Sequence, residues 1–128
     1  MKISEQDERV SCHTKKITGQ KITLEFPSVG ATENLILAAC LAEGVTWIGN
    51  AAKEPEIIGL CRFLRMAGAT IEGEGTEHIL IRGVTKLHSV EFTLCHDRIV
   101  LQTMGLLVSA TGGSVILHTG EENSGTDI

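Results

Sequence analysis

The feature that most constrains the fold is a short alternating segment that runs directly into a long apolar helix. Residues 22–26 alternate between apolar and polar side chains, which is the period of a half-buried strand. Pro27 ends this strand because proline cannot donate a hydrogen bond to a neighbouring strand. Residues 31–43 are good helix formers, and Gly44 supplies a stop signal. The segment therefore predicts a strand, a tight turn and a helix, a unit from which α/β folds are built.

The turn between this strand and this helix is a candidate anion-binding site. Ser28, Val29 and Gly30 open the helix, where several backbone N–H groups lack partners and point out of the helix end. Together with the helix dipole, these groups favour a phosphate or a carboxylate. The alternative is that Ser28 only caps the helix and Gly30 only relieves a tight turn. The local pattern alone favours this alternative.

The pattern continues with a second helix and a hairpin. A β-rich run at residues 45–48 precedes a helix in which Pro55 fits the first turn and Gly68 marks the end. Two alternating runs, residues 69–72 and 78–82, then flank a Gly-Glu-Gly-Thr turn, which is a hairpin signal. The predicted order is strand, helix, strand, helix, strand, strand.

The same pattern then restarts and stops early. A strand at residues 92–94 is followed by a helix that Asp97 opens and Gly112 ends, and by a strand at residues 114–117. Upstream of both copies, residues 1–7 are predicted to fray and residues 9–14 to form an edge strand. The predicted organisation is an N-terminal edge segment (1–13), a complete βαβαββ unit (14–87), a partial second unit (88–119) and a disordered tail (120–128). A self-contained α/β sandwich is the alternative to an incomplete set of repeats.

Charge and hydropathy limit the partners and the compartment. The net charge of −5, without any cluster of Lys or Arg, argues against nucleic acid as the main partner. No apolar run reaches the length of about 18 residues that spans a bilayer, and the polar N-terminus is unlike a secretory signal. We therefore expect a cytoplasmic chain with no membrane partner.

The four cysteines give no sign of a metal or redox site. They are far apart and form no C-x-x-C pair, so we expect no metal ligation. Cys40 and Cys61 fall in helical patterns and Cys95 in a strand pattern, where cysteines are usually small buried hydrophobes. These three and Cys12 are predicted to be structural or incidental rather than catalytic.

Five short motifs in a fixed order carry a resemblance to a known family. SVGATEN, LAEG, NAAKEPEI, LRMAGA and GEGT are each weak alone but specific together. From about Arg9 to about His118, the chain resembles an interior part of the UDP-N-acetylglucosamine enolpyruvyl transferases (1-carboxyvinyltransferases). The resemblance implies two domains, each an inside-out α/β barrel of three βαβαββ units. The present chain would supply one complete unit and part of a second.

The resemblance also implies a reaction and a ligand. The family transfers the enolpyruvyl group of phosphoenolpyruvate to the 3-hydroxyl of UDP-N-acetylglucosamine in peptidoglycan synthesis, with no cofactor. The segment that matches Phe26, Pro27, Ser28, Val29 and Gly30 lines the nucleotide and diphosphate site, although some relatives have a lysine at the position of Phe26. These five residues are therefore the predicted UDP-sugar-binding residues.

Four further charged residues are predicted near the interdomain cleft of the family fold. They are Glu54, Glu56, Asp97 and Arg98. For Glu54 and Glu56, favourable interaction with the positive end of a helix explains the charges at least as well. The residues after Arg98 depart from the family pattern, which weakens the assignment of that helix face to the active site.

No catalytic residue is assigned, because the family's main catalytic groups have no counterpart in this chain. The loop that carries the catalytic cysteine or aspartate, the general base and the arginines that hold the carboxylate are all missing, and transfer needs them in one cleft. The chain alone is therefore predicted to be inactive. The alternative function is a non-catalytic module that self-associates into a homo-oligomer through open sheet edges. The related shikimate-pathway transferase ranks lower.

Overall fold

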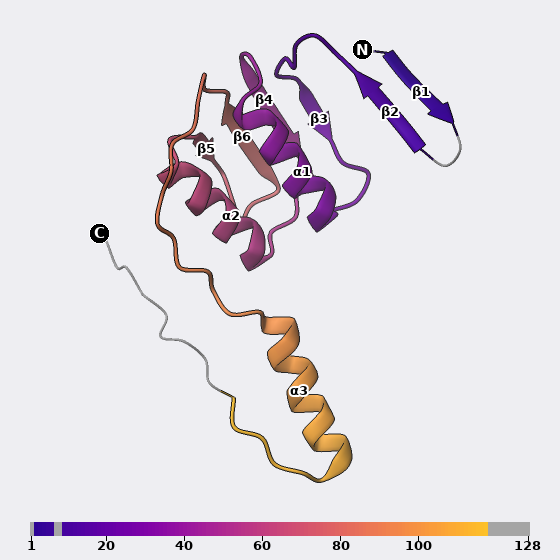
Figure 1. Cartoon of the computed structure of the whole chain (residues 1–128), viewed down its shortest axis with the longest axis vertical. Helices are drawn as coiled ribbons and strands as arrows, with labels where there is room; N and C mark the ends of the chain where they lie inside the picture. Colours follow the sequence, from indigo (N-terminus) through magenta and orange to yellow (C-terminus); the bar gives the residue numbers. More distant parts are fainter. Residues whose placement is uncertain (1, 7–8, 118–128) are drawn as a thin grey trace. The chain divides into compact units, whose positions relative to one another are not determined.

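The computed structural model describes residues 2–6 and 9–117 and divides the chain into two compact units. The first unit comprises residues 1–92 and the second residues 93–128. Figure 1 shows the elements of each unit along the chain.

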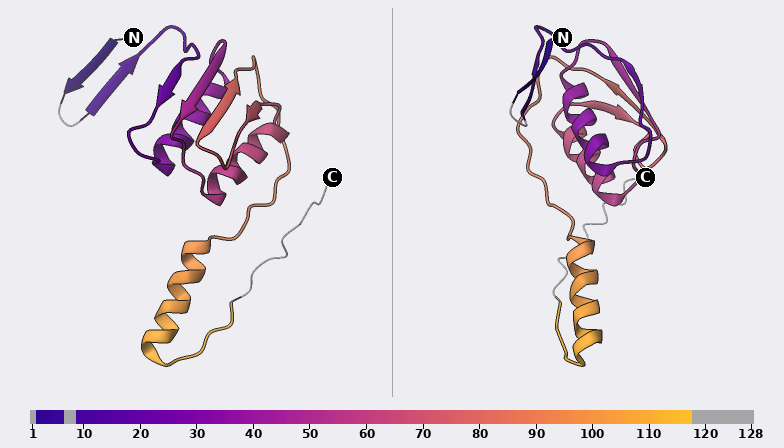
Figure 2. Two further views of the ribbon diagram at one scale, coloured as in Figure 1. Left: turned by 180° about the vertical axis from the view of Figure 1, so that it is seen from behind. Right: turned by 90° about the vertical axis from the view of Figure 1, so that its right-hand side faces the viewer.

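A mixed four-stranded sheet forms the centre of the first unit. In spatial order its strands are β3 (Lys21–Thr23), β4 (Val45–Gly49), β6 (His78–Arg82) and β5 (Thr70–Glu72). The first pair is parallel and the other two pairs are antiparallel. Helices α1 (Val29–Cys40) and α2 (Pro55–Met66) lie together on one face of this sheet (Figure 2). The chain is therefore α/β, and the predicted order of strand, helix, strand, helix, strand, strand is confirmed for these elements.

The core of the first unit lies between the two helices and the sheet. It is lined by branched aliphatic side chains because the strands alternate, turning every second residue toward the helices. The largest fully buried hydrophobic side chains are Ile36, Ile48, Ile57, Ile79, Ile81, Cys40 and Cys61. The other face of the sheet carries Trp47, the only tryptophan, with the Lys21 ammonium 4.6 Å from its ring centroid.

The expected burial of the cysteines is confirmed on the two helices and wrong for Cys95. Cys40 on α1 and Cys61 on α2 are free thiols in the core. Burial raises the pKa of both thiols, that of Cys61 to about 11. Cys95 is exposed because its segment forms no strand that could be covered. The side chain of Cys12 lies outside the described residues.

Helix α1 ends at Cys40, four residues before the predicted stop. The chain turns at Leu41 because the backbone of Glu43 bonds to an upstream segment: its N–H donates to the Ile17 carbonyl at 2.9 Å and its carbonyl accepts from the Gly19 N–H at 2.7 Å. Gly44 still has the left-handed backbone (φ 90°) of a glycine at a turn. A long-range backbone pairing thus sets the end of the helix.

The N-terminal prediction is half right. The edge strand exists as β2 (Arg9–His13). The segment predicted to fray instead forms β1 (Lys2–Gln6), which pairs antiparallel with β2 in the register Lys2↔His13 to Gln6↔Arg9. The neighbouring strand supplies the hydrogen-bonding partner that the polar composition of this segment did not reveal.

The β5–β6 hairpin is joined to α2 by an ion pair. Gly73 and Gly75 adopt left-handed backbones in the turn, with φ of 86° and 79°. The Glu74 carboxylate between them accepts a hydrogen bond from the Arg65 guanidinium of α2. Partial desolvation alone would raise the pKa of Glu74, but the bond and charge of Arg65 outweigh it, and the pKa lies below the ordinary value of 4.5.

We expect Glu74→Gln to lower stability at neutral pH but not in acid. Because the pKa of Glu74 is lowered by folding, its contribution is present above the unfolded pKa and is lost as the pH falls through the folded pKa. The partly exposed partner limits the effect to about 1 kcal/mol or less. Urea unfolding at about pH 7 and about pH 3, followed by Trp47 fluorescence, measures it. Glu72→Gln is the control, and equal urea midpoints for Glu74→Gln and wild type at neutral pH would contradict the prediction.

The described part of the second unit, residues 93–117, contains one helix, α3 (Arg98–Thr111), with both caps as predicted. The Asp97 carboxylate accepts from the N–H groups of Ile99 at 2.8 Å and Val100 at 3.2 Å, and Gly112 ends the helix with φ 65°. Within the described residues, α3 buries none of its side chains.

The two strands predicted beside α3 are wrong. Residues 92–94 and 114–117 are described, and neither segment forms a strand. Phe92 instead packs edge-on against Phe63 of α2, with ring centroids 5.5 Å apart. A strand needs a neighbour for its backbone groups, and the described part of the second unit offers none. The predicted tail, residues 120–128, lies outside the described residues. Among the described helices, none is both long and apolar enough to cross a membrane.

Candidate ligand site at two helix starts

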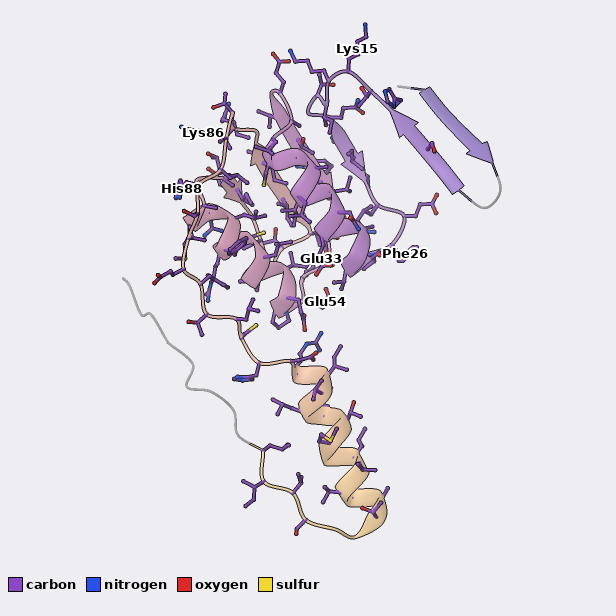
Figure 3. The ribbon with its side chains drawn as sticks, in the orientation of Figure 1. Lys15, Phe26, Glu33, Glu54, Lys86 and His88 are labelled. Atoms are coloured by element: carbon purple, nitrogen blue, oxygen red, sulfur yellow. The ribbon has the colours of Figure 1, made fainter. Side chains whose placement is uncertain are left out.

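The candidate site lies where α1 and α2 begin, at the carboxyl ends of the parallel strands β3 and β4 (Figure 1). We call residues 26–30 the first helix start and residues 50–54 the second helix start. Open α/β sheets bind ligands at this edge, because helix N-termini converge there. Figure 3 shows the side chains of Phe26, Glu33 and Glu54 at this end of the unit.

The first helix start has the geometry of a capped helix. Ser28 is the N-cap, with φ −80° and ψ 125°, and its Oγ accepts the Ala31 N–H at 3.3 Å. The Ser28 N–H donates to the Phe26 carbonyl at 2.8 Å. The capping role is therefore confirmed. The N–H groups of Val29 and Gly30 belong to the first turn, where helix geometry supplies no acceptor within the helix.

The surface around Gly30 is open. Gly30 is exposed, its φ is negative, and a Cβ added to it would meet nothing within 4 Å. Gly30 therefore lies inside the helix and relieves no tight turn, so that alternative is wrong for Gly30. Phe26 beside it is 67% exposed, and Pro27 is exposed as well. The first helix start thus leaves room for a bound group over its unpartnered N–H groups.

Three hydrogen bonds hold the second helix start against Leu24 and Glu77. Asn50 is the one non-glycine residue with a positive φ (55°) among those described, and its Nδ2 donates to the Leu24 carbonyl at 3.0 Å. The Ala51 N–H donates to the Glu77 carbonyl at 3.0 Å, and the Lys53 ammonium lies 2.9 Å from the Glu77 carboxylate. The hydrogen bond and charge of Lys53 lower the pKa of Glu77. Lys53 is therefore already paired beside the site.

A buried hydroxyl connects the two helix starts. Thr32 is fully buried, and its Oγ1 donates to the Ser28 carbonyl at 2.7 Å. The same oxygen accepts the Ala52 N–H at 3.1 Å. Sequence reasoning missed both Thr32 and Asn50. A threonine four residues after a capping serine and an asparagine at a strand end are weak signals, since Asn tolerates left-handed backbones and Thr bonds back to the preceding turn.

The predicted carboxylates of α2 lie at its positive end. Glu54 is the N-cap residue and Glu56 stands in the first turn. Glu54 makes no side-chain capping bond, and its Oε2 is buried without a hydrogen-bond partner among the described residues. The positions suit the helix-charge interpretation. Asp97 and Arg98 belong to the second unit, where Asp97 caps α3.

Comparison with known proteins places the chain in a family. A sequence model of EPSP synthase (3-phosphoshikimate 1-carboxyvinyltransferase) matches residues 1–127. The chain is 51% identical over 109 residues to UDP-N-acetylglucosamine 1-carboxyvinyltransferase 1 of Caldanaerobacter subterraneus subsp. tengcongensis, covering 85% of this chain and 26% of that protein. It is 50% identical over 106 residues to the Corynebacterium efficiens UDP-N-acetylglucosamine 1-carboxyvinyltransferase, covering 83% and 25%.

A third relative has the same name and a similar identity to this chain. The Synechocystis sp. UDP-N-acetylglucosamine 1-carboxyvinyltransferase is 54% identical over 91 residues, covering 71% of this chain and 21% of that protein. The chain thus spans about a quarter of the length of these relatives. Because the family match extends over nearly all of its residues, the chain belongs to the EPSP synthase family.

Proposed function

We propose that this chain carries the UDP-sugar-binding part of a UDP-N-acetylglucosamine 1-carboxyvinyltransferase. The observation that carries the proposal is about 50% identity, over more than four fifths of the chain, to two proteins of that name. The same similarity favours this function over the non-catalytic self-associating module. The reaction would move the enolpyruvyl group of phosphoenolpyruvate to a sugar hydroxyl and release phosphate, as part of peptidoglycan synthesis.

The first helix start supports the ligand assignment physically. A nucleotide sugar presents a diphosphate, and the N–H groups of Val29 and Gly30 stand at the positive end of α1 without acceptors in the helix. The space above Gly30 allows an anion to approach the backbone closely. In this proposal the backbone donors of Val29 and Gly30 hold the diphosphate, and Ser28 borders it as the helix cap, because its own N–H is bonded to the Phe26 carbonyl. Phe26 and Pro27 border the site without adding charge.

The exposed apolar side chains of the first unit support its place in a larger fold. Leu37 on α1 and Leu41 directly after it, and Phe63 and Met66 on α2, are exposed although they are large and hydrophobic. Such a surface is typical of a face that packs against further elements. We propose that this unit is one βαβαββ repeat of an inside-out barrel and that α3 belongs to the next repeat. The catalytic loop, the general base and the arginine clamp would come from elsewhere, and the chain alone would be inactive.

The test is an NMR titration of the purified chain. We expect saturable shifts of the Val29 and Gly30 amides with UDP-N-acetylglucosamine, and also with UDP, because both carry the diphosphate. Uridine, which has no phosphate, is the matched control and should leave both amides in place. A folded spectrum that does not respond to millimolar UDP-N-acetylglucosamine would overturn the binding proposal.

A further inference from the structure

The Ser28 carbonyl accepts two hydrogen bonds from the same residue, Thr32. The Thr32 N–H donates to it at 3.0 Å, as in any helix, and the Thr32 hydroxyl donates to it at 2.7 Å. Thr32 is 0% exposed, so water does not compete for either bond. The orientation of the Ser28 carbonyl is therefore fixed along the axis of α1.

That orientation sets the direction of the neighbouring N–H group. A trans peptide is planar, and its N–H points opposite to its carbonyl. When the Ser28 carbonyl points into α1 toward Thr32, the Val29 N–H of the same peptide must point out of the helix end. Thr32 thus restrains, through one peptide plane, a donor that the proposed ligand would use.

The same hydroxyl also restrains the second helix start. By accepting the Ala52 N–H at 3.1 Å, it ties the chain before α2 to the first turn of α1. Asn50 makes a parallel connection, since its side chain bonds the Leu24 carbonyl before the first helix start. One buried oxygen, Oγ1 of Thr32, is therefore hydrogen-bonded to both segments that border the candidate site.

We infer that Thr32 is a positioning residue: its hydroxyl orients the Ser28–Val29 peptide toward the ligand and holds the second helix start beside it. The inference about the ligand rests on the proposed function, whereas the positioning itself rests on the geometry alone. Thr32 touches no reacting group. Its effect reaches the ligand through the Val29 N–H and through the placement of residues 50–54.

Two substitutions at Thr32 separate the hydroxyl from the shape of the side chain. Thr32→Val keeps the branched shape but removes the donor and the acceptor, whereas Thr32→Ser keeps the hydroxyl and removes the methyl group. Thr46→Val is the control, because Thr46 is also buried but lies at the other end of β4. All four proteins are compared by NMR at a temperature where each is folded.

The amide signals test the positioning without any ligand. We expect faster hydrogen exchange at Ala52 and a displaced Val29 amide in Thr32→Val, near-native signals in Thr32→Ser, and no change at these amides in Thr46→Val. Unchanged Val29 and Ala52 amides in a folded Thr32→Val protein would overturn the inference. If Thr32→Val fails to fold, Thr32→Ser decides. Native Val29 and Ala52 amide signals in Thr32→Ser support the inference. Displacement of these signals, although the hydroxyl is retained, overturns it.

Ligand affinity tests the link to the proposed function. With UDP-N-acetylglucosamine, we expect Kd to rise at least about fivefold in Thr32→Val, about the value of one hydrogen bond, with rescue in Thr32→Ser. A purely structural role would lower the unfolding temperature of Thr32→Val and leave Kd unchanged, which would overturn the inference. If the wild-type chain binds nothing, the proposed function fails, and the amide signals still decide the positioning.

Discussion

Replacing Gly30 by aspartate is expected to weaken binding of UDP-N-acetylglucosamine strongly while leaving the fold at least as stable. A carboxylate in the first turn of α1 interacts favourably with the helix dipole, so the free energy of unfolding should stay equal or rise by up to about 1 kcal/mol. The same carboxylate would occupy the open space above residue 30 and repel a diphosphate. We expect affinity to fall at least about a hundredfold, measured by isothermal titration.

The control for this substitution is Gly105→Asp in the second unit. Gly105 is also a helical glycine with nothing within 4 Å of an added Cβ, so the variant carries the same extra charge in a similarly open setting. Gly30→Ala adds only a methyl group and separates steric from electrostatic loss. If Gly30→Asp is folded and binds the UDP-sugar as tightly as wild type, the diphosphate does not lie over this turn.

Replacing Gly83 by alanine is expected to disrupt the first unit. Directly after β6, the backbone of Gly83 packs against the turn that follows α1. A Cβ on Gly83 would lie 1.6 Å from the Ala42 carbonyl oxygen in that turn. The neighbouring bond from the Val84 N–H to the Cys40 carbonyl, 2.8 Å long, holds this approach in place. Because backbone rather than a flexible side chain blocks the methyl group, we expect a loss of at least about 3 kcal/mol.

Thermal unfolding followed by Trp47 fluorescence measures this loss. For a unit of this size, the midpoint should fall by more than about 10 °C. Gly59→Ala on α2 is the matched control, because an added Cβ there meets nothing within 4 Å and alanine favours a helix by up to about 1 kcal/mol. A Gly83→Ala protein as stable as wild type would mean that β6 does not meet α1 this closely.

The sequence predicted the elements of the first unit better than their ends. The strands and helices follow from periods of alternating and helical spacing, which are local properties of the chain. The end of α1 at Cys40 was not predictable, because Glu43 bonds to Ile17 and Gly19, which lie more than twenty residues upstream. β1 was missed for a related reason, since its sequence is mostly polar and only its pairing with β2 defines it.

In the second unit the sequence predicted the helix correctly and the strands wrongly. The helix signals, Asp97 and Gly112, are local and gave the right helix. The apolar residues at 92–94 and 114–117 suit strands, but a strand also needs a partner, and composition does not say whether one is present.

The candidate site was predictable only in part. Ser28 was recognisable as a cap because serine before a helix has a local function that spacing reveals. Thr32 and Asn50 make long-range hydrogen bonds, to Ala52 and Leu24, and no local sequence pattern predicts such partners. The open surface over Gly30 likewise depends on the tertiary structure, in which no atom lies within 4 Å of a Cβ added at this position.

The two buried thiols can report how often each helix of the first unit opens to solvent. Cys40 lies on α1 and Cys61 on α2, and each is covered in the folded unit, whereas Cys95 is exposed. In a variant with serine at Cys12 and Cys95, a thiol reagent can react only when one of the two helices exposes its cysteine. Comparing the two reaction rates under native conditions would show whether the helices open together or one at a time. Equal rates would identify the unit as a single cooperative block, and unequal rates would reveal which helix leaves the sheet first.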